Sequence, residues 1–150
     1  MHESLDISLT MAAAPRILVA SGSISGLDHE TFGSNETMSA PVHERIVLTQ
    51  TDVPQNLINI SKGWGGECRL EVTITARLQT DRRILAIING KLYEGDSETT
   101  NDLDDEQTTT CLVPKGGLPV PFTMQLRNSG SGDTGTISLT FVNSLFEEQE

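Results

Sequence analysis

The chain has 150 residues, of which 21 are acidic and 10 basic, so its formal net charge at pH 7 is -11. This length suits a single domain, residues 1–150, that folds around one core without needing a metal or a disulfide. The acidic excess argues against a nucleic-acid partner, because neutralising phosphates requires clustered lysines and arginines. No stretch approaches the roughly 18 apolar residues of a transmembrane helix, so we expect no membrane span.

The beginning of the chain alternates between apolar and polar residues from Leu5 to Met11. This pattern predicts that residues 1–14 form an edge strand or a flexible start. The same segment lacks a basic region, and Pro15 and Arg16 interrupt the nearest apolar run. A secretory signal needs a basic region followed by an uninterrupted apolar run, so we expect a cytoplasmic protein.

Three short strands and one long loop are expected in the first part of the chain. Residues 15–23 predict the first strand, and residues 45–51 and 57–61 predict two more that a Pro-containing turn separates. Residues 26–41 are rich in Gly, Ser, Asn and Asp, and they predict a long loop.

The only tryptophan, Trp64, lies between Gly63 and Gly65, which places it on a turn. Two interpretations are open. An exposed indole would bind a sugar ring or anchor a protein ligand, and a buried indole would cover one end of the core.

The clearest strand covers residues 67–80, because every even position from Cys68 to Leu78 is apolar and the odd positions are polar. Residues 83–93 predict the next strand, whose run from Ile84 to Ile88 is apolar on both faces. We therefore expect it to be central, with a second face that meets another sheet or another subunit.

An acidic segment at residues 94–106 joins that strand to the next, and seven of its 13 residues are acidic while none is basic. Several carboxylates on one loop can assemble the six to eight oxygens that Ca²⁺ requires. Oxygen-only donors favour Ca²⁺ over zinc or copper. The expected metal ligands are Asp96, Asn101, Asp102, Asp104 and Asp105.

The alternative for this loop is a solvated acidic face that confers solubility and prevents aggregation of strand edges. The spacing does not match an EF-hand, since Asn101 occupies the position that requires glycine when counting starts at Asp96.

The last third of the chain predicts three more strands, at residues 108–113, 122–127 and 136–141, with dense turn residues at 128–135. Residues 144–150 form an acidic tail. Together these segments make about eight or nine strands and no helix. They predict an all-β antiparallel β-sandwich, either a jelly roll or a C2-like Greek key.

The two cysteines, Cys68 and Cys111, both fall on apolar sides of predicted strands. They form either two buried free thiols or a disulfide, and the cytoplasmic expectation favours free thiols. The three histidines, His2, His29 and His43, are far apart in sequence, and no catalytic motif is present. We therefore expect no enzymatic activity.

Two functions of different class are consistent with these features. In the first, the protein is a non-enzymatic binding module that holds Ca²⁺ through residues 94–106 and a carbohydrate or protein ligand beside it. In the second, it is a structural protein that forms a homo-oligomer through its long strands, and the acidic loop is only a solvated face.

Overall fold

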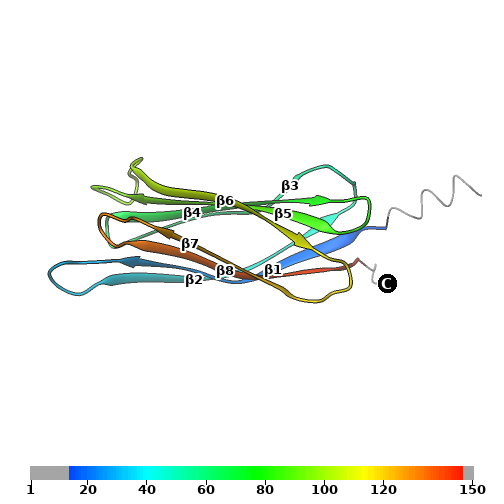
Figure 1. Cartoon of the computed structure of the whole chain (residues 1–150), viewed down its shortest axis with the longest axis horizontal. Helices are drawn as coiled ribbons and strands as arrows, with labels where there is room; N and C mark the ends of the chain where they lie inside the picture. The colour runs from blue at the N-terminus through cyan, green and yellow to red at the C-terminus, as the bar shows by residue number, and fades with distance from the viewer. Residues whose placement is uncertain (1–13, 147–150) are drawn as a thin grey trace, which may run out of the picture.

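The computed structural model describes residues 14–146 as eight strands in two antiparallel sheets that face each other (Figure 1). This confirms the predicted all-β sandwich. The predictions for residues 1–13 and 147–150 lie outside the described part of the chain. The strands are β1 (Arg16–Asp28), β2 (Glu36–Leu48), β3 (Gln55–Trp64), β4 (Cys68–Leu78), β5 (Ile84–Glu94), β6 (Leu103–Val113), β7 (Val120–Arg127) and β8 (Thr134–Leu145).

The strand order is β2-β1-β8-β7 in one sheet and β3-β4-β5-β6 in the other. Strands that follow one another in the chain are neighbours within a sheet, except that β2 and β3, and likewise β6 and β7, face each other across the sandwich. The first and last strands, β1 and β8, pair with each other. This up-and-down order lacks the crossing connection of a Greek key, so that detail of the prediction is wrong for the described strands. Alternating residues reveal strands, but they do not reveal the order of strands in a sheet.

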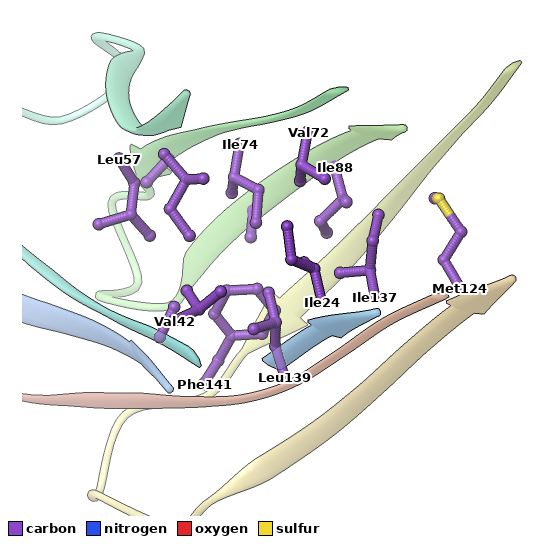
Figure 2. Close-up of a cluster of buried hydrophobic side chains, with 14 of the residues drawn as sticks. Ile24, Val42, Leu57, Val72, Ile74, Ile88, Met124, Ile137, Leu139 and Phe141 are labelled. Atoms are coloured by element: carbon purple, nitrogen blue, oxygen red, sulfur yellow. The ribbon is translucent and has the colours of Figure 1, made fainter. Parts of the chain in front are cut away.

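Apolar side chains from the inner faces of both sheets form the core. Figure 2 shows Val72, Ile74 and Ile88 from one sheet facing Ile24 and Ile137 from the other. The period-two burial of β4 and β5 produces this layer, as the sequence predicts. β5 is a central strand, and the side chains on its outer face are half-buried.

The two predicted loops are shorter than expected. β1 continues to Asp28 and β2 begins at Glu36, so only residues 29–35 connect them. The prediction of a loop at residues 26–41 is therefore wrong. Gly26 lies on the inner face of β1, where an added Cβ would be 2.4 Å from the Trp64 ring. β6 begins at Leu103, so only residues 95–102 of the acidic segment form a connection.

The connections of the sandwich gather at its two ends. Residues 29–35, 65–67, 95–102 and 128–133 lie at one end, which we call the acidic end (left in Figure 1). The chain enters at Arg16 and leaves after Leu145 at the opposite end. Within residues 14–146, no helix is long and apolar enough to cross a membrane.

Both cysteines are free thiols, as the sequence analysis favoured. Cys68 is paired with Glu94 at the acidic end, and Cys111 is paired with Ala86. These two partners are eight residues apart on β5. At about 3.3 Å per residue, the separation is far beyond the reach of a disulfide.

Candidate metal centre

Carboxylates from all four connections and from the adjoining strand ends converge at the acidic end. Antiparallel pairing brings the end of β1 beside the start of β2, the end of β5 beside the start of β6, and the end of β7 beside the start of β8. Segments far apart in sequence thus contribute acidic side chains to one end of the sandwich. These residues are Asp28, Glu30, Glu36, Glu67, Glu94, Asp96, Glu98, Asp102, Asp104 and Asp133.

The centre of this end is a group of three buried residues, Asp28, Cys68 and Asp133. One donor atom from each lies within 4.8 Å of the other two. Their exposed fractions are 2% for Asp28, 0% for Cys68 and 1% for Asp133. We call these three residues the inner group.

Each member of the inner group is held by the ends of the strands. Asp28 is the last residue of β1 and continues its inward-facing positions, and Cys68 is the first residue of β4. Asp133 directly precedes β8, and its Oδ1 accepts a hydrogen bond of 2.9 Å from the backbone N–H of His29. The Sγ of Cys68 lies 3.8 Å from Asp133 Oδ2 and donates to it.

The carboxylate of Asp28 is incompletely bonded. Its Oδ2 is buried and accepts no hydrogen bond from the described part of the chain. The backbone of Gly65 comes so close that an added Cβ would lie 2.5 Å from this oxygen. A buried carboxylate oxygen without a partner costs free energy, so the site favours a ligand that carries positive charge.

Burial and mutual repulsion act together on these groups. Burial first, and then the charge of Asp133, raises the pKa of Asp28 to about 7. Burial also raises the pKa of the Cys68 thiol, and the nearby carboxylates of Asp133 and Asp28 raise it further. Without a cation, Cys68 therefore stays a neutral thiol at physiological pH.

A second group shares Asp28 and consists only of carboxylates. Oxygens of Asp28, Glu30 and Glu36 lie within 4.8 Å of one another. We call these three residues the outer group. Asn35 shapes the connection, because its Oδ1 accepts a hydrogen bond of 2.8 Å from the backbone N–H of Glu30.

The structure separates the five metal ligands expected in residues 94–106. Asp96 and Asn101 lie on the connection after β5, and Asp102 directly precedes β6. Asp104 and Asp105 are neighbours within β6. Among residues 14–146, no three acidic side chains of this segment bring oxygens within 4.8 Å of one another. The segment therefore does not by itself form a compact ligand set.

Asp105 is bound to the neighbouring strand. Its Oδ2 accepts a hydrogen bond of 2.9 Å from the backbone N–H of Arg127. Asp104 instead has a buried Oδ2 that accepts no hydrogen bond from the described residues. Burial, followed by the charge of Asp102, raises the pKa of Asp104, and burial with the charge of Asp133 raises that of Glu94. Asp102, Asp104 and Glu94 thus belong to the same repulsive region as the inner group.

Of the two interpretations of Trp64, the structure shows the buried one. Trp64 ends β3, is 5% exposed and covers Gly26, so its indole is not available as an exposed sugar platform. The exposed aromatic residue at the acidic end is Phe32, which is 92% exposed on the connection between β1 and β2. Phe32 is not among the site residues predicted from the sequence. Its signal was an aromatic residue within a stretch of turn residues.

The opposite end of the sandwich carries Arg16, Arg82, Arg83 and Lys115 against Asp52 and Asp81, and we call it the basic end. Its bonding differs from that of the acidic end. Arg16 is buried there, and its Nε donates a hydrogen bond of 2.9 Å to Asn143 Oδ1. A cavity of about 520 Å³ opens beside it. Its lining residues are Arg16, Lys115, Gly116, Gly117, Ser144 and Leu145. None of these residues belongs to the inner or outer group.

Comparison with known proteins does not place the chain in a family. No protein-family profile and no curated protein sequence matches it. One similar solved structure is the secretin InvG of the Salmonella SPI-1 type III secretion injectisome (residues 176 to the end, open gate state). It is 15% identical, with 99% of this chain aligned to 65% of that chain at a TM-score of 0.33. This chain thus spans less than two thirds of the length of that solved chain, and a likeness this weak carries no inference about function.

Proposed function

We propose that the protein is a non-enzymatic β-sandwich module that binds a divalent cation, Ca²⁺, at its acidic end. The observation that carries this proposal is the outer group, in which Asp28, Glu30 and Glu36 bring oxygens within 4.8 Å of one another. Carboxylate oxygens are the donors that Ca²⁺ takes, and Ca²⁺ accepts six to eight of them in flexible geometry. Water and backbone carbonyls would complete the shell.

Electrostatic repulsion at this end supports the proposal. The pKa values of Asp28, Glu94 and Asp104 are all raised, first by burial and then by neighbouring carboxylates. A bound divalent cation would reverse this effect, because an opposite charge at close range favours the ionised form of each carboxyl group. Of residues 94–106, Glu94 and Asp104 are coupled to this end through the charge of Asp133.

We propose that a carbohydrate or protein ligand binds beside the cation. Phe32 supports this part, because a 92% exposed aromatic ring on the connection between β1 and β2 offers an apolar contact. The loop that carries Phe32 also carries Glu30 and begins next to Asp28. A ligand that contacts Phe32 would therefore meet the cation as well.

Thermal unfolding with millimolar Ca²⁺ tests the cation site. A ligand that binds only the folded state at 100 times its dissociation constant adds about 2.7 kcal/mol to the free energy of unfolding. We expect the wild-type Tm to rise, and the rise to shrink in Glu30→Gln and in Asp104→Asn.

Asp52→Asn is the matched control, since it removes one carboxylate from the opposite end. Asp52 has a φ of 62°, a conformation that asparagine adopts readily. This variant should keep the full Ca²⁺ response. A wild-type Tm that Ca²⁺ leaves unchanged would overturn the proposal, and so would an equal loss of response in Asp52→Asn. A glycan array with and without Ca²⁺ then tests the carbohydrate ligand.

We retain self-assembly as a second candidate because of exposed apolar residues at the opposite end. Leu118 is 70% exposed and Leu145 is 47% exposed, and Leu145 lines the cavity beside Arg16. Light scattering after size-exclusion chromatography measures the mass. A larger mass that Leu118→Ser reduces to one chain would support assembly, and a single chain at high concentration would contradict it.

A further inference from the structure

We propose that Asp28, Cys68 and Asp133 form a separate inner site for one thiophilic divalent cation of the zinc class. This goes beyond the proposed Ca²⁺ function. The inner site shares Asp28 with the outer group but does not require that Ca²⁺ binds. Its distinguishing ligand is a thiolate sulfur, which calcium sites do not use.

The geometry of the three donors is close to what zinc needs. Zinc bonds of about 2.0 Å to oxygen and 2.3 Å to sulfur place two tetrahedral oxygen ligands about 3.3 Å apart and an oxygen and a sulfur about 3.5 Å apart. Cys68 Sγ and Asp133 Oδ2 are already 3.8 Å apart, and all three donor atoms lie within 4.8 Å of one another. Binding therefore requires side chains that the strand ends already hold together to move closer, by about 0.3 Å between Cys68 Sγ and Asp133 Oδ2 and by up to about 1.5 Å for the other pairs.

The orphaned oxygen of Asp28 is an independent indication of a ligand. Asp28 is 2% exposed, and its Oδ2 accepts no hydrogen bond within residues 14–146. The side chain is one of the three whose donor atoms converge. A cation coordinated by this oxygen would offset the desolvation cost that the protein leaves uncompensated.

The donor set also selects the kind of ion. Two carboxylates and one cysteine sulfur suit zinc and other borderline ions, whereas Ca²⁺ and Mg²⁺ take oxygen ligands alone. On binding, the S–H bond of Cys68 breaks, the thiol proton and any proton held by the Asp28 and Asp133 carboxyl groups pass to solvent, and one sulfur–metal and two oxygen–metal bonds form. No oxidation state changes, and two carboxylates with one thiolate leave the bound site with one net negative charge.

Titration of the metal-free protein with Co²⁺ tests the inner site, because cobalt replaces zinc in such sites and absorbs light. A cobalt–thiolate bond gives a strong charge-transfer band in the near ultraviolet. We expect this band in the wild type at one equivalent of Co²⁺, and we expect excess Zn²⁺ to remove it. Cys111→Ser should keep the band, and Cys68→Ser should lose it.

Either cysteine variant alone can assign the thiolate ligand, because the chain contains only these two cysteines. If Cys68→Ser fails to fold, a band that persists in Cys111→Ser assigns the thiolate to Cys68. A wild-type protein without the band would overturn the proposal, and the inner group would then be explained by a proton that Asp28 and Asp133 share. A band that persists in Cys68→Ser and disappears in Cys111→Ser would overturn it as well.

The two cation proposals fail separately. Glu30→Gln should weaken the Ca²⁺ response and keep the cobalt band, whereas Cys68→Ser should lose the band and keep the Ca²⁺ response. If Ca²⁺ has no effect on the wild type but the band appears, the proposed function is wrong and the inner site stands. If Ca²⁺ stabilises the wild type and the band is missing, the inner site is wrong and the proposed function stands.

Discussion

The two ends of this sandwich bury polar groups in opposite ways. At the basic end, Arg16 donates to Asn143 through Nε at 2.9 Å and through Nη2 at 3.3 Å. The Asn143 side chain in turn donates at 3.0 Å to the carbonyls of Arg82 and Val113. At the acidic end, Asp28 and Asp104 each have a buried oxygen that accepts no hydrogen bond from the described residues.

The difference shows that the Arg16–Asn143 network is complete without a ligand, although Arg77 Nε near the same end is buried without a partner among the described residues. A buried polar group is stable in a protein when its hydrogen bonds are satisfied. Asn143 meets this condition, because its side-chain oxygen accepts from Arg16 and its side-chain nitrogen donates to two carbonyls. The carboxylates of the acidic end repel one another instead. The same pair of sheets therefore has one end whose Arg16–Asn143 network is satisfied by its own side chains, and one end that we propose a cation completes.

Removing Asn143 should have the largest effect on stability. Asn143→Ala leaves the buried guanidinium of Arg16 without its side-chain acceptor and the carbonyls of Arg82 and Val113 without their donor. We expect a loss of about 3 kcal/mol in the free energy of unfolding, measured by urea denaturation. Ser144→Ala, at the next residue, is the control and should lose far less. Equal losses would show that the network is not what stabilises this end.

The acidic end should make the metal-free protein less stable as pH rises. The pKa of Asp28 is about 7 in the folded protein against an ordinary value of 3.8. Between these values the folded state holds a proton that the unfolded state has lost, so the stabilisation is complete below about pH 4 and disappears as pH rises through 7. We expect a loss of about 2 kcal/mol between pH 5 and pH 8 in the presence of a chelator.

Asp28→Asn should remove most of this pH dependence, and Asp52→Asn should keep it. The raised pKa values of Glu94 and Asp104 have the same sign, so a small slope will remain in Asp28→Asn. A wild-type protein whose urea midpoint rises from pH 5 to pH 8 would show that the folded state does not hold this extra proton.

A smaller effect should come from the glycine next to Asp28. Gly65 and Gly66 have φ values of 66° and 74°, so alanine costs about 1 kcal/mol at either position. Only at Gly65 does the added Cβ approach Asp28 Oδ2, at 2.5 Å, whereas nothing lies within 4 Å at Gly66. We expect Gly65→Ala to lose about 1 kcal/mol more than Gly66→Ala in urea denaturation. Equal losses would show that the carboxylate is free to move away.

Most of the fold was predictable because alternation identifies half-buried strands, as β4 and β5 show. The prediction failed where the inner face carries residues that are not apolar. Gly26 and Asp28 occupy inward positions of β1, and they concealed the end of that strand. Acidic residues also concealed the start of β6, because Asp104, Asp105 and Glu106 interrupt the apolar alternation there.

The acidity of the site was predictable, but its centre was not. Residues 94–106 were visible as a charge run, whereas the inner group combines single residues from β1, β4 and the turn before β8. No local pattern links Asp28, Cys68 and Asp133. Only the pairing of strands brings them together, and strand order could not be read from alternation. One pattern in the sequence points to Asp28. The inner side chains of β1 stand at even positions, and extending that alternation along the chain reaches Asp28.

The most direct test of this account compares the wild type with Asp28→Asn in thermal unfolding, because Asp28 belongs to both cation groups. Each protein is measured with chelator, with excess Ca²⁺, with excess Zn²⁺, and with NaCl at matched ionic strength. We predict that a divalent cation raises the wild-type Tm by about 5 °C or more and leaves that of Asp28→Asn unchanged. Equal shifts in the two proteins, or a wild-type shift that NaCl reproduces, would contradict a cation site at the acidic end.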